Sequence, residues 1–213
     1  QVAHSVFSIP RKIARVREQS YLAIDYSDLY RAEHMPIDFI ISPEKEVANT
    51  AIKRLASQVL EKIPYIDSLL LIGIPTKGIY LSKLLATYLE ELSGEPIKNG
   101  CLDPTFHRDD LSRVGPRISQ ATDLPSTVDD REVVLVDDVI YTGRTVKAAL
   151  EALHSWGRAK RVLLVAMVDR GHREVPIQPD FCGRIVPTSK DETIDLRLRE
   201  VDGEEGVFLC KKT

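Results

Sequence analysis

Two kinds of apolar pattern alternate along most of this chain. One is a short run of consecutive aliphatic residues, such as LLLI at residues 69–72, and it is typical of a strand buried on both faces. The other repeats apolar residues every three or four positions, as in residues 47–63, and it predicts a helix with one apolar stripe. The runs predict strands at residues 37–42, 69–72, 97–102, 132–136 and 161–168. The repeats predict helices at residues 43–62, 79–92 and 145–156.

This alternation predicts an α/β fold with a central, mostly parallel sheet that is flanked by helices. Ligands of such a sheet bind beyond the carboxyl ends of the strands, where the connecting loops converge. Residues 105–130 form a long polar connection, and a loop of this length inside a compact domain is usually functional. Apolar alternation in residues 193–200, followed by Asp202-Gly203 and an apolar stretch at 207–209, predicts a C-terminal hairpin.

The strand at residues 132–136 leads into the most informative segment, VVLVDDVIYTGRT at residues 133–145. The loop before the following helix offers unpaired backbone N–H groups, which bind anions such as phosphate. Gly143 lets the backbone approach a ligand closely, and Thr142 and Thr145 add hydroxyl donors. Asp137 and Asp138 repel phosphate, but they accept hydrogen bonds from sugar hydroxyls or lie near a metal ion. The segment therefore predicts a ligand that carries a phosphate and a vicinal diol.

Composition narrows the class of protein without naming a function. The 213 residues are 43% hydrophobic and 29% charged, as in an ordinary globular α/β domain. The net charge is −3, so any contact with nucleic acid must come from a local basic patch. The three cysteines lie far apart without metal-ligand spacing, and no apolar run approaches the ~20 residues of a membrane span. With no signal-peptide pattern either, we expect a cytoplasmic protein that has no membrane partner.

Several segments together resemble one enzyme family. VVLVDDVIYTGRT is similar to the phosphoribosyl pyrophosphate (PRPP) signature of type I phosphoribosyltransferases. LLLIGIPTKGIYLSKLL (69–85), LDPTFHRDDLSR (102–113), VDRGHREVPI (168–177) and GRIVPTSK (183–190) resemble the PyrR family in the family's own order. PyrR proteins regulate the pyrimidine operon and are also uracil phosphoribosyltransferases. The resemblance extends from about Ala51 to the C-terminus.

The resemblance implies a type I phosphoribosyltransferase fold with a long flap loop and a C-terminal hairpin. It also implies the reaction of uracil with PRPP, which gives UMP and pyrophosphate. The implied cofactor is Mg²⁺, bound through the substrate with no direct protein ligand, although Asp109 and Asp110 can reach it through water. The implied catalytic residues are Asp137, Asp138, Arg108 and Asp109. The implied PRPP and phosphate ligands are Thr76, Lys77, Gly78, Tyr141, Thr142, Gly143, Arg144 and Thr145, and the implied base ligands are Val168 and Arg170.

The resemblance leaves the roles of Lys77 and His172 open. Lys77 stands where the family usually has Arg, so the charge is kept but the planar, two-point geometry is lost. His172, beside the implied base ligands, is either a structural residue or a residue that faces the ligand. Each of these positions needs the structure to decide its role.

The family resemblance implies a second activity and an assembly. PyrR proteins bind a hairpin in pyrimidine-operon mRNA, UMP favours that binding, and the subunits form dimers or larger homo-oligomers. The positions where the family has basic residues are matched here by Lys53, Arg54, Arg173 and Arg184. Gln178 and Ser57 replace residues that are usually basic or His, and fewer cationic contacts mean weaker RNA binding.

The N-terminal part of the chain has a different character. IPRKIARVREQSYL and MPIDFIISPEKEVANTAIKRL resemble part of the nucleotide-binding domain of Trk-type potassium-uptake regulators, but G-x-G-x-x-G is missing from the chain. We interpret residues 1–46 as an atypical segment from a fusion and residues 47–213 as the phosphoribosyltransferase domain. The remaining alternatives are an RNA attenuation protein without turnover, a phosphoribosyltransferase for a purine or orotate, and an ion-transport regulatory module.

Overall fold

The computed structural model describes residues 37–42, 47–110 and 119–211. By its contacts the chain divides into two compact units, Gln1–His34 and Met35–Thr213, and all the described residues belong to the second unit. The expected helix start at Pro43 and residues 111–118 of the expected flap lie outside the described residues. Within the described ranges, no helix is both long enough and apolar enough to cross a membrane.

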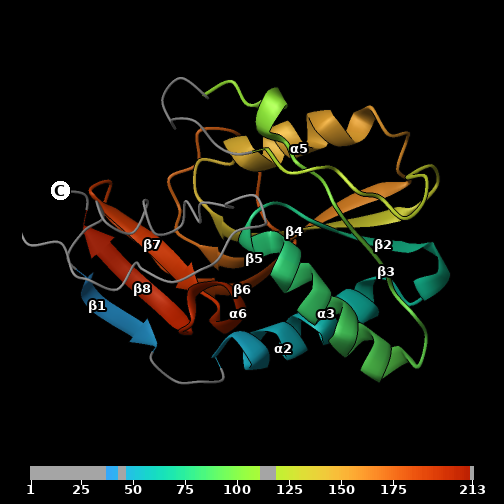
Figure 1. The fold of residues 1–213 in the computed structure, drawn as a ribbon. Coiled ribbons are helices and arrows are strands. Elements are labelled where there is room, and N and C mark those ends of the chain that lie inside the picture. Colours follow the sequence, from blue (N-terminus) through green and yellow to red (C-terminus); the bar gives the residue numbers. More distant parts are fainter. Residues whose placement is uncertain (1–36, 43–46, 111–118, 212–213) are drawn as a thin grey trace, which may run out of the picture. The chain divides into compact units, whose positions relative to one another are not determined.

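A five-stranded parallel sheet runs through this unit (Figure 1). Its strands lie in the order β3-β2-β4-β5-β6, and every neighbouring pair is parallel. All five residues of β2 are buried, which is the two-sided burial that its aliphatic run predicts. The strands are β2 (Leu69–Gly73), β3 (Lys98–Cys101), β4 (Glu132–Ile140), β5 (Arg161–Asp169) and β6 (Phe181–Ile185).

Helices cover both faces of the parallel sheet (Figure 1). On one face, α2 (Val47–Lys62) and α3 (Lys77–Ser93) share an apolar core with Leu71 of β2. On the other face, α5 (Arg144–His154) shares a second core with Leu70. Successive strand residues point to opposite faces, so one aliphatic run supplies both cores. Two short 3-10 turns lie next to strands of this sheet. The turn η1 (Ile66–Ser68) directly precedes β2, and η2 (Thr105–His107) follows β3.

The C-terminal hairpin is part of a separate, three-stranded antiparallel sheet. β7 (Glu192–Arg197) and β8 (Gly206–Lys211) pair antiparallel, as their alternation predicts. A short helix, α6 (Arg199–Asp202), stands in the connection and ends at Gly203. β1 (Ile37–Ser42) pairs with the other edge of β8, so the strand order is β1-β8-β7. The expected fold class, including the hairpin, is therefore confirmed.

Two details of the parallel sheet differ from the expected elements. β4 does not end before the acidic pair but continues to Ile140, because its ladder with β5 still pairs Val139 with Val168 and Ile140 with Asp169. β6 was not expected as a strand. It is an edge strand in which no residue is buried, so it lacks the apolar signal that identifies the inner strands.

Candidate active site

The two carboxylates predicted to hold a sugar lie near the carboxyl end of β4. Asp137 is only 5% exposed, and Asp138 is half-buried. The Asp138 N–H donates to Oδ1 of Asp137 over 3.0 Å, and the Val139 N–H donates to Oδ1 of Asp138 over 2.8 Å. These local bonds fix the direction of both carboxylates. Both therefore stand at the edge where parallel sheets bind their ligands.

The loop after β4 is shaped by one glycine. Gly143 has φ +87° and caps the start of α5, a backbone conformation that other residues adopt at a cost. A Cβ atom on Gly143 would lie 2.7 Å from Cγ2 of Val175, so there is also no space for a side chain. The Thr142 hydroxyl accepts the Arg144 N–H over 3.3 Å. The first N–H groups of a helix have no partners within the helix, so this loop can bind an anion.

A cavity of about 330 Å³ brings part of the predicted site together, including Asp137 but not Asp138. Eight of the predicted residues line it: Arg108, Asp110, Asp137, Tyr141, Thr142, Gly143, Thr145 and Arg170. Five further residues were not predicted: Val139, Ile140, Val146, Thr193 and Ile194. A signal for Val139 existed in the sequence, because residues two apart in a strand share a face and Asp137 is two positions away. Thr193 and Ile194 lie in β7 of the antiparallel sheet. Only the folding of the chain brings them to the cavity, so no local sequence signal identifies them.

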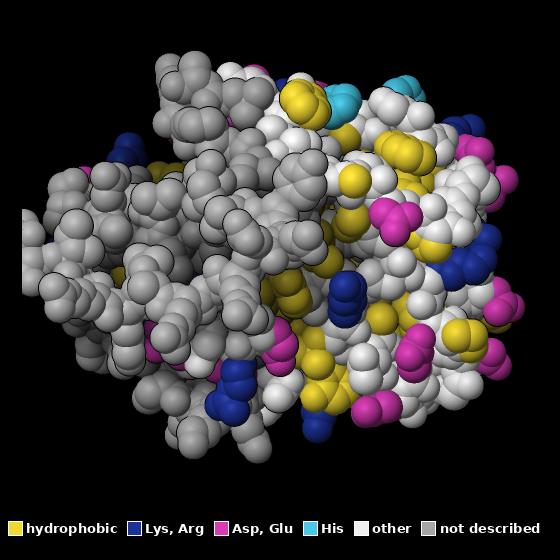
Figure 2. All heavy atoms as spheres, in the orientation of Figure 1, with side chains coloured by type: hydrophobic (Ala, Val, Ile, Leu, Met, Phe, Trp, Pro, Cys, Tyr) yellow, Lys and Arg dark blue, Asp and Glu magenta, His cyan; other side chains and the backbone are white. Residues whose placement is uncertain are grey.

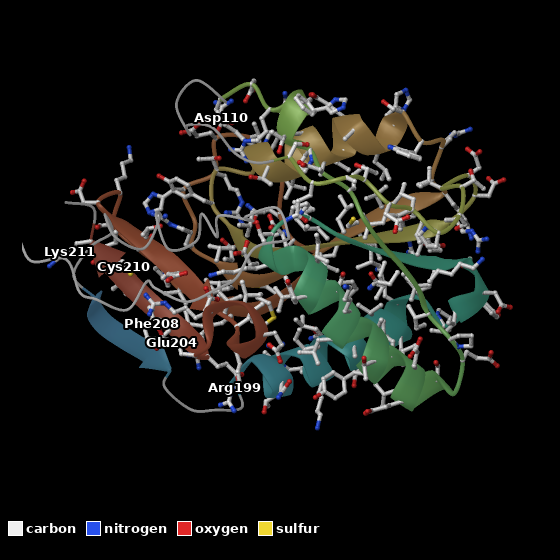
Figure 3. The ribbon with its side chains drawn as sticks, viewed as in Figure 1. Asp110, Arg199, Glu204, Phe208, Cys210 and Lys211 are labelled. Atoms are coloured by element: carbon white, nitrogen blue, oxygen red, sulfur yellow. The ribbon has the colours of Figure 1, made fainter. Side chains whose placement is uncertain are left out.

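Arg108 links the start of the expected flap to residues 141–145 after β4, which we call the phosphate loop after its predicted ligand. Its guanidinium binds both oxygens of Asp110, Nε over 2.8 Å and Nη2 over 2.7 Å, and its Nη1 donates to the Thr145 hydroxyl. The Arg108 side chain is 7% exposed and that of Asp110 is 16% exposed. Asp110 lies on the chain that follows η2 (Figure 3). A cation is thus held at the mouth of the phosphate loop by a two-point carboxylate contact.

Arg144 and Asp109 form an exposed ion-pair group beside the cavity. Nη1 of Arg144 lies 2.9 Å from Asp109, and its Nε lies 2.8 Å from Glu174. The hydrogen bond from Arg144 lowers the pKa of Asp109, and the charges of Arg144 and Lys147 act in the same direction. The carboxylates of Asp109 and Glu174 are largely open to solvent. Neither Arg144 nor Asp109 lines the cavity in this conformation.

Arg170, a predicted base ligand, lies in the cavity wall and is 3% exposed. We call its side of the cavity the base side. The Arg170 guanidinium lies 3.9 Å from the centre of the Tyr141 ring and donates to the Thr193 hydroxyl over 3.0 Å. Burial lowers the pKa of Arg170, but a guanidinium remains protonated at neutral pH. Nε2 of His172 lies 2.6 Å from the Thr188 carbonyl oxygen, so His172 has a structural hydrogen bond. Val168 is buried in β5 between β4 and β6.

The loop after β2 does not present its lysine to the cavity. Lys77 lies 3.0 Å from Asp195 and 3.4 Å from Asp202, and its Nζ also donates to the Leu196 carbonyl. Burial raises the pKa of Asp195, but the charges and hydrogen bonds of Lys77 and Arg197 outweigh it, so the net pKa is lowered.

The two residues on either side of Lys77 play different parts. Thr76 is exposed and precedes α3, while Gly78 is buried. A Cβ atom on Gly78 would collide with the Val136 carbonyl, so this glycine lets the start of α3 lie directly on β4. Neither Thr76 nor Gly78 lines the cavity.

The four basic residues matched to RNA contacts differ in their surroundings. Lys53, Arg54 and Arg184 are exposed, but Arg54 donates to the Gly183 carbonyl over 2.5 Å and Lys53 lies 5.1 Å from the centre of the Tyr88 ring. The Arg173 side chain is 12% exposed and points inward. On the face drawn in Figure 2, basic and acidic side chains are interspersed over the described surface.

The acidic residues of the site suit a metal ion that arrives with its ligand. In the described ranges, no group of three or more His, Cys, Asp or Glu side chains stands close enough to hold a metal by itself. Asp109 and Asp110 are each paired with an arginine. Magnesium keeps several waters and needs few protein ligands, so one or two carboxylates near a pyrophosphate are sufficient.

Comparison with known proteins identifies the family of the chain. The family model of the phosphoribosyl transferase domain matches residues 44–199. The Bifunctional protein PyrR of Thermosynechococcus vestitus is 50% identical over 159 residues, which are 74% of this chain and 87% of that protein. The Bifunctional protein PyrR of Gloeothece citriformis is 44% identical over 177 residues, which are 83% of this chain and all of that protein. That match is longer than residues 47–213, so it extends past the expected domain boundary, which itself stays a prediction.

Solved structures support the fold. A mutant of the hypoxanthine phosphoribosyltransferase of Trypanosoma cruzi, in complex with the product IMP, superposes with a TM-score of 0.63 at 17% identity. The superposition covers 84% of this chain and 86% of that protein. Sequence identity this low establishes the architecture alone, whereas the family is established by the curated relatives. The chain belongs to the PyrR family of phosphoribosyltransferases.

Proposed function

We propose that this chain transfers the phosphoribosyl group of PRPP to uracil and releases pyrophosphate. The proposal rests on one observation: a buried carboxylate, Asp137, and the N-terminal loop of α5 line the same cavity. The loop suits a 5′-phosphate and the carboxylate suits the ribose hydroxyls. Family membership supplies the reaction class.

The phosphate loop would supply binding energy away from the reacting carbon. In our proposal the backbone N–H groups at Gly143 and Arg144, with the hydroxyls of Thr142 and Thr145, hold the 5′-phosphate. Tyr141 flanks this loop through its contact with Arg170. Contacts with a remote phosphate position the anomeric carbon for attack by N1 of uracil, whose proton passes to solvent as the C1–N1 bond forms.

The acidic pair would act on the ribose. As the bond between C1 and the pyrophosphate oxygen breaks, positive charge develops on the ring. Asp137 and Asp138 hold the ribose hydroxyls and lie near that charge, which is the electrostatic support such a transition state needs. We propose no covalent intermediate, since no nucleophile has to attack the sugar before uracil does.

Pyrophosphate would be bound by two other segments. We propose that the backbone of Thr76, Lys77 and Gly78 binds one side of it and that Arg108 binds the other. When bound, Mg²⁺ neutralises the leaving pyrophosphate, and Asp109 or Asp110 would hold its water ligands. Arg108 is supported by its place in the cavity wall. Its release from Asp110 would free a carboxylate and a cation together.

Uracil would be read at the base side of the cavity. We propose that main-chain groups next to Val168 contact its polar edge and that Arg170 lies against the ring or its carbonyl groups. Arg170 is already fixed by Tyr141 and Thr193, so it would be a preorganised wall. A wall that is fixed in advance favours one base shape over others.

An assay with a panel of bases tests this function directly. Purified protein is incubated with PRPP, Mg²⁺ and one of uracil, hypoxanthine or orotate, and nucleotide formation is followed. We expect UMP to form with uracil and the other two bases to react far more slowly. Nucleotide formation with another base alone would assign a different phosphoribosyltransferase activity. Absence of turnover with all three would favour an attenuation protein that binds RNA only.

We also propose that the protein regulates pyrimidine genes by binding an mRNA hairpin when UMP is bound. The curated relatives carry the name "Bifunctional protein PyrR", and Lys53, Arg54 and Arg184 offer exposed cations. Filter binding of a hairpin RNA with and without UMP, across a salt series, tests this role. We expect affinity to rise with UMP and to fall as salt increases. RNA binding that does not depend on salt would contradict the proposed contacts between these cations and RNA phosphates.

The domain organisation can be tested by truncation. We propose that the protein is cytoplasmic and homo-oligomeric and that its catalytic unit does not need the first 34 residues. β1 pairs with β8, and β8 pairs with β7, which carries Thr193 to the cavity. A chain starting at Met35 should therefore keep uracil conversion, whereas a chain starting at Val47 should lose stability because a strand of that sheet is missing. Equal stability of the two chains, measured by urea unfolding, would contradict the role given to β1.

A further inference from the structure

The segment after β5 encloses an arginine that the proposed mechanism does not use. Nε of Arg173 donates to the Ile177 carbonyl over 2.8 Å, and Nη1 donates to the Tyr141 carbonyl over 2.8 Å and to the Gly171 carbonyl over 3.2 Å. Nη2 lies 2.6 Å from Asp169 and 3.4 Å from Oε1 of Gln178. All three guanidinium nitrogens have acceptors within the protein, so this is a built contact rather than a solvated side chain.

The contacts of Arg173 connect the two halves of the cavity. Tyr141 belongs to the phosphate loop, whereas Asp169 ends β5 directly before the base-side residue Arg170. The Arg173 and Asp169 side chains are 12% and 13% exposed. Oδ1 of Asp169 accepts the Gly171 N–H over 2.9 Å, so both of its oxygens are used. An ion pair with this little solvent is costly to break on one side only.

Independent contacts place the same segment against the phosphate loop. The N–H groups of Glu174 and Val175 donate to the Thr142 carbonyl over 3.0 and 3.2 Å. The missing Cβ of Gly143 leaves the space that Val175 occupies. Residues 173–177 therefore form the outer wall of the loop, and Arg173 is the side chain that fastens this wall.

We infer that Arg173 is a positioning residue that holds the phosphate loop in its binding conformation from the base side of the cavity. The inference rests on the proposed function, because it assumes that the loop binds the 5′-phosphate of PRPP or UMP. Arg173 itself does not line the cavity. Its loss should loosen the loop and weaken binding of every ligand with a 5′-phosphate, while the chemical step changes less.

The test compares Arg173→Met and Arg173→Lys with a matched control, Arg161→Met. Arg161 forms an ion pair with Glu132 at the opposite end of the same two strands, with Nε 2.6 Å from the carboxylate. Urea unfolding, KM for PRPP, kcat, and the calorimetric Kd of UMP and of PRPP are measured for each protein. We expect Arg173→Met to raise KM and both Kd values about tenfold or more, from the loss of a buried charged partner. We expect Arg173→Lys to fall in between and Arg161→Met to lower stability alone.

The outcomes separate this inference from the proposed function. If wild-type protein binds PRPP but makes no UMP, the proposed function fails, and the calorimetric values still decide the role of Arg173. If Arg173→Met keeps the wild-type Kd for PRPP and UMP, or if Arg161→Met shifts them equally, the positioning role is overturned. Should Arg173→Met not fold, Arg173→Lys carries the comparison, since it keeps the charge but loses the fixed geometry of the bonds.

Discussion

The loops after β2 and β4 begin alike and end differently. Each follows an inner parallel strand and leads directly into a helix, α3 or α5. The loop after β4 turns its small residues and hydroxyls into the cavity. The loop after β2 sends its one charged side chain, Lys77, to carboxylates of the C-terminal segment. The same local layout thus places side chains in the cavity wall in one case and links two sheets through a side chain in the other.

The difference lies in what surrounds each loop. Beside the loop after β4, Glu174 and Val175 cover the backbone from outside, and the other side of the loop lines the cavity. Beside the loop after β2, Asp195 and Asp202 offer two negative charges within reach of the lysine. A cationic side chain this close to two carboxylates is strongly stabilised by their charges.

The largest expected effect comes from adding a side chain where Val175 already packs against the phosphate loop. Gly143→Ala adds a Cβ where φ is +87° and Val175 is too close, so strain and overpacking act together. We expect KM for PRPP to rise about 100-fold, from roughly 2–3 kcal/mol of lost binding. Steady-state kinetics measures it.

Gly94→Ala is the matched control for this change. Gly94 has φ +74° with nothing within 4 Å of the added Cβ, so it carries the backbone strain without the collision. It should cost about 1 kcal/mol of stability and leave KM unchanged. Equal KM in both variants would mean that the phosphate loop tolerates a side chain and has another role.

Removing one charge of the acidic pair comes next. Asp138→Asn keeps the shape of the side chain but removes negative charge near the developing cation, so we expect turnover to fall at least about tenfold. UMP formation from labelled uracil measures it. Asp130→Asn, an equally small change at an exposed position with φ +56°, should leave turnover unchanged. A near-normal rate for Asp138→Asn would place Asp138 outside the reaction.

A smaller effect is expected where Lys77 meets the C-terminal sheet. Because the pKa of Asp195 is lowered in the folded protein, its charge stabilises the fold above the ordinary pKa of about 3.9, and this contribution is lost as pH falls through the lowered value. Asp195→Asn should reduce the free energy of unfolding at pH 7 by about 1 kcal/mol, since the pair is partly exposed. Urea unfolding from pH 7 downward should show a flatter acid profile for the variant. Identical profiles would show that Lys77 is not held there.

The smallest effect is expected at the surface of the phosphate loop. The Arg144 side chain pairs with the exposed carboxylates of Asp109 and Glu174, and such pairs contribute little. Arg144→Gln keeps the backbone N–H at the helix start, so KM for PRPP should change by less than about threefold. A tenfold rise would show that the side chain, and not only the backbone, binds the ligand.

Local sequence predicted the parts of the site that lie on inner strands. The strands β2 and β4 are recognisable in the sequence because burial on both sides requires a continuous aliphatic run. The polar residues of the loop after β4 are consecutive in the sequence, so they could be recognised as one motif. β6 escaped prediction because an exposed edge strand lacks such an aliphatic run. The partners of Lys77, the wall formed by Thr193 and the contacts of Arg173 depend on residues brought together only by the folded chain.

The antiparallel sheet has a consequence for how the protein is made. β1 pairs Ile37 with Cys210, so the two ends of the described chain must meet before that sheet is complete. Such distant pairings form late, because a long stretch of chain must be closed to make them. During synthesis the parallel core can assemble first, while the wall that carries Thr193 waits for the final strand to leave the ribosome. Nascent chains should therefore acquire a stable core before they can recognise a base.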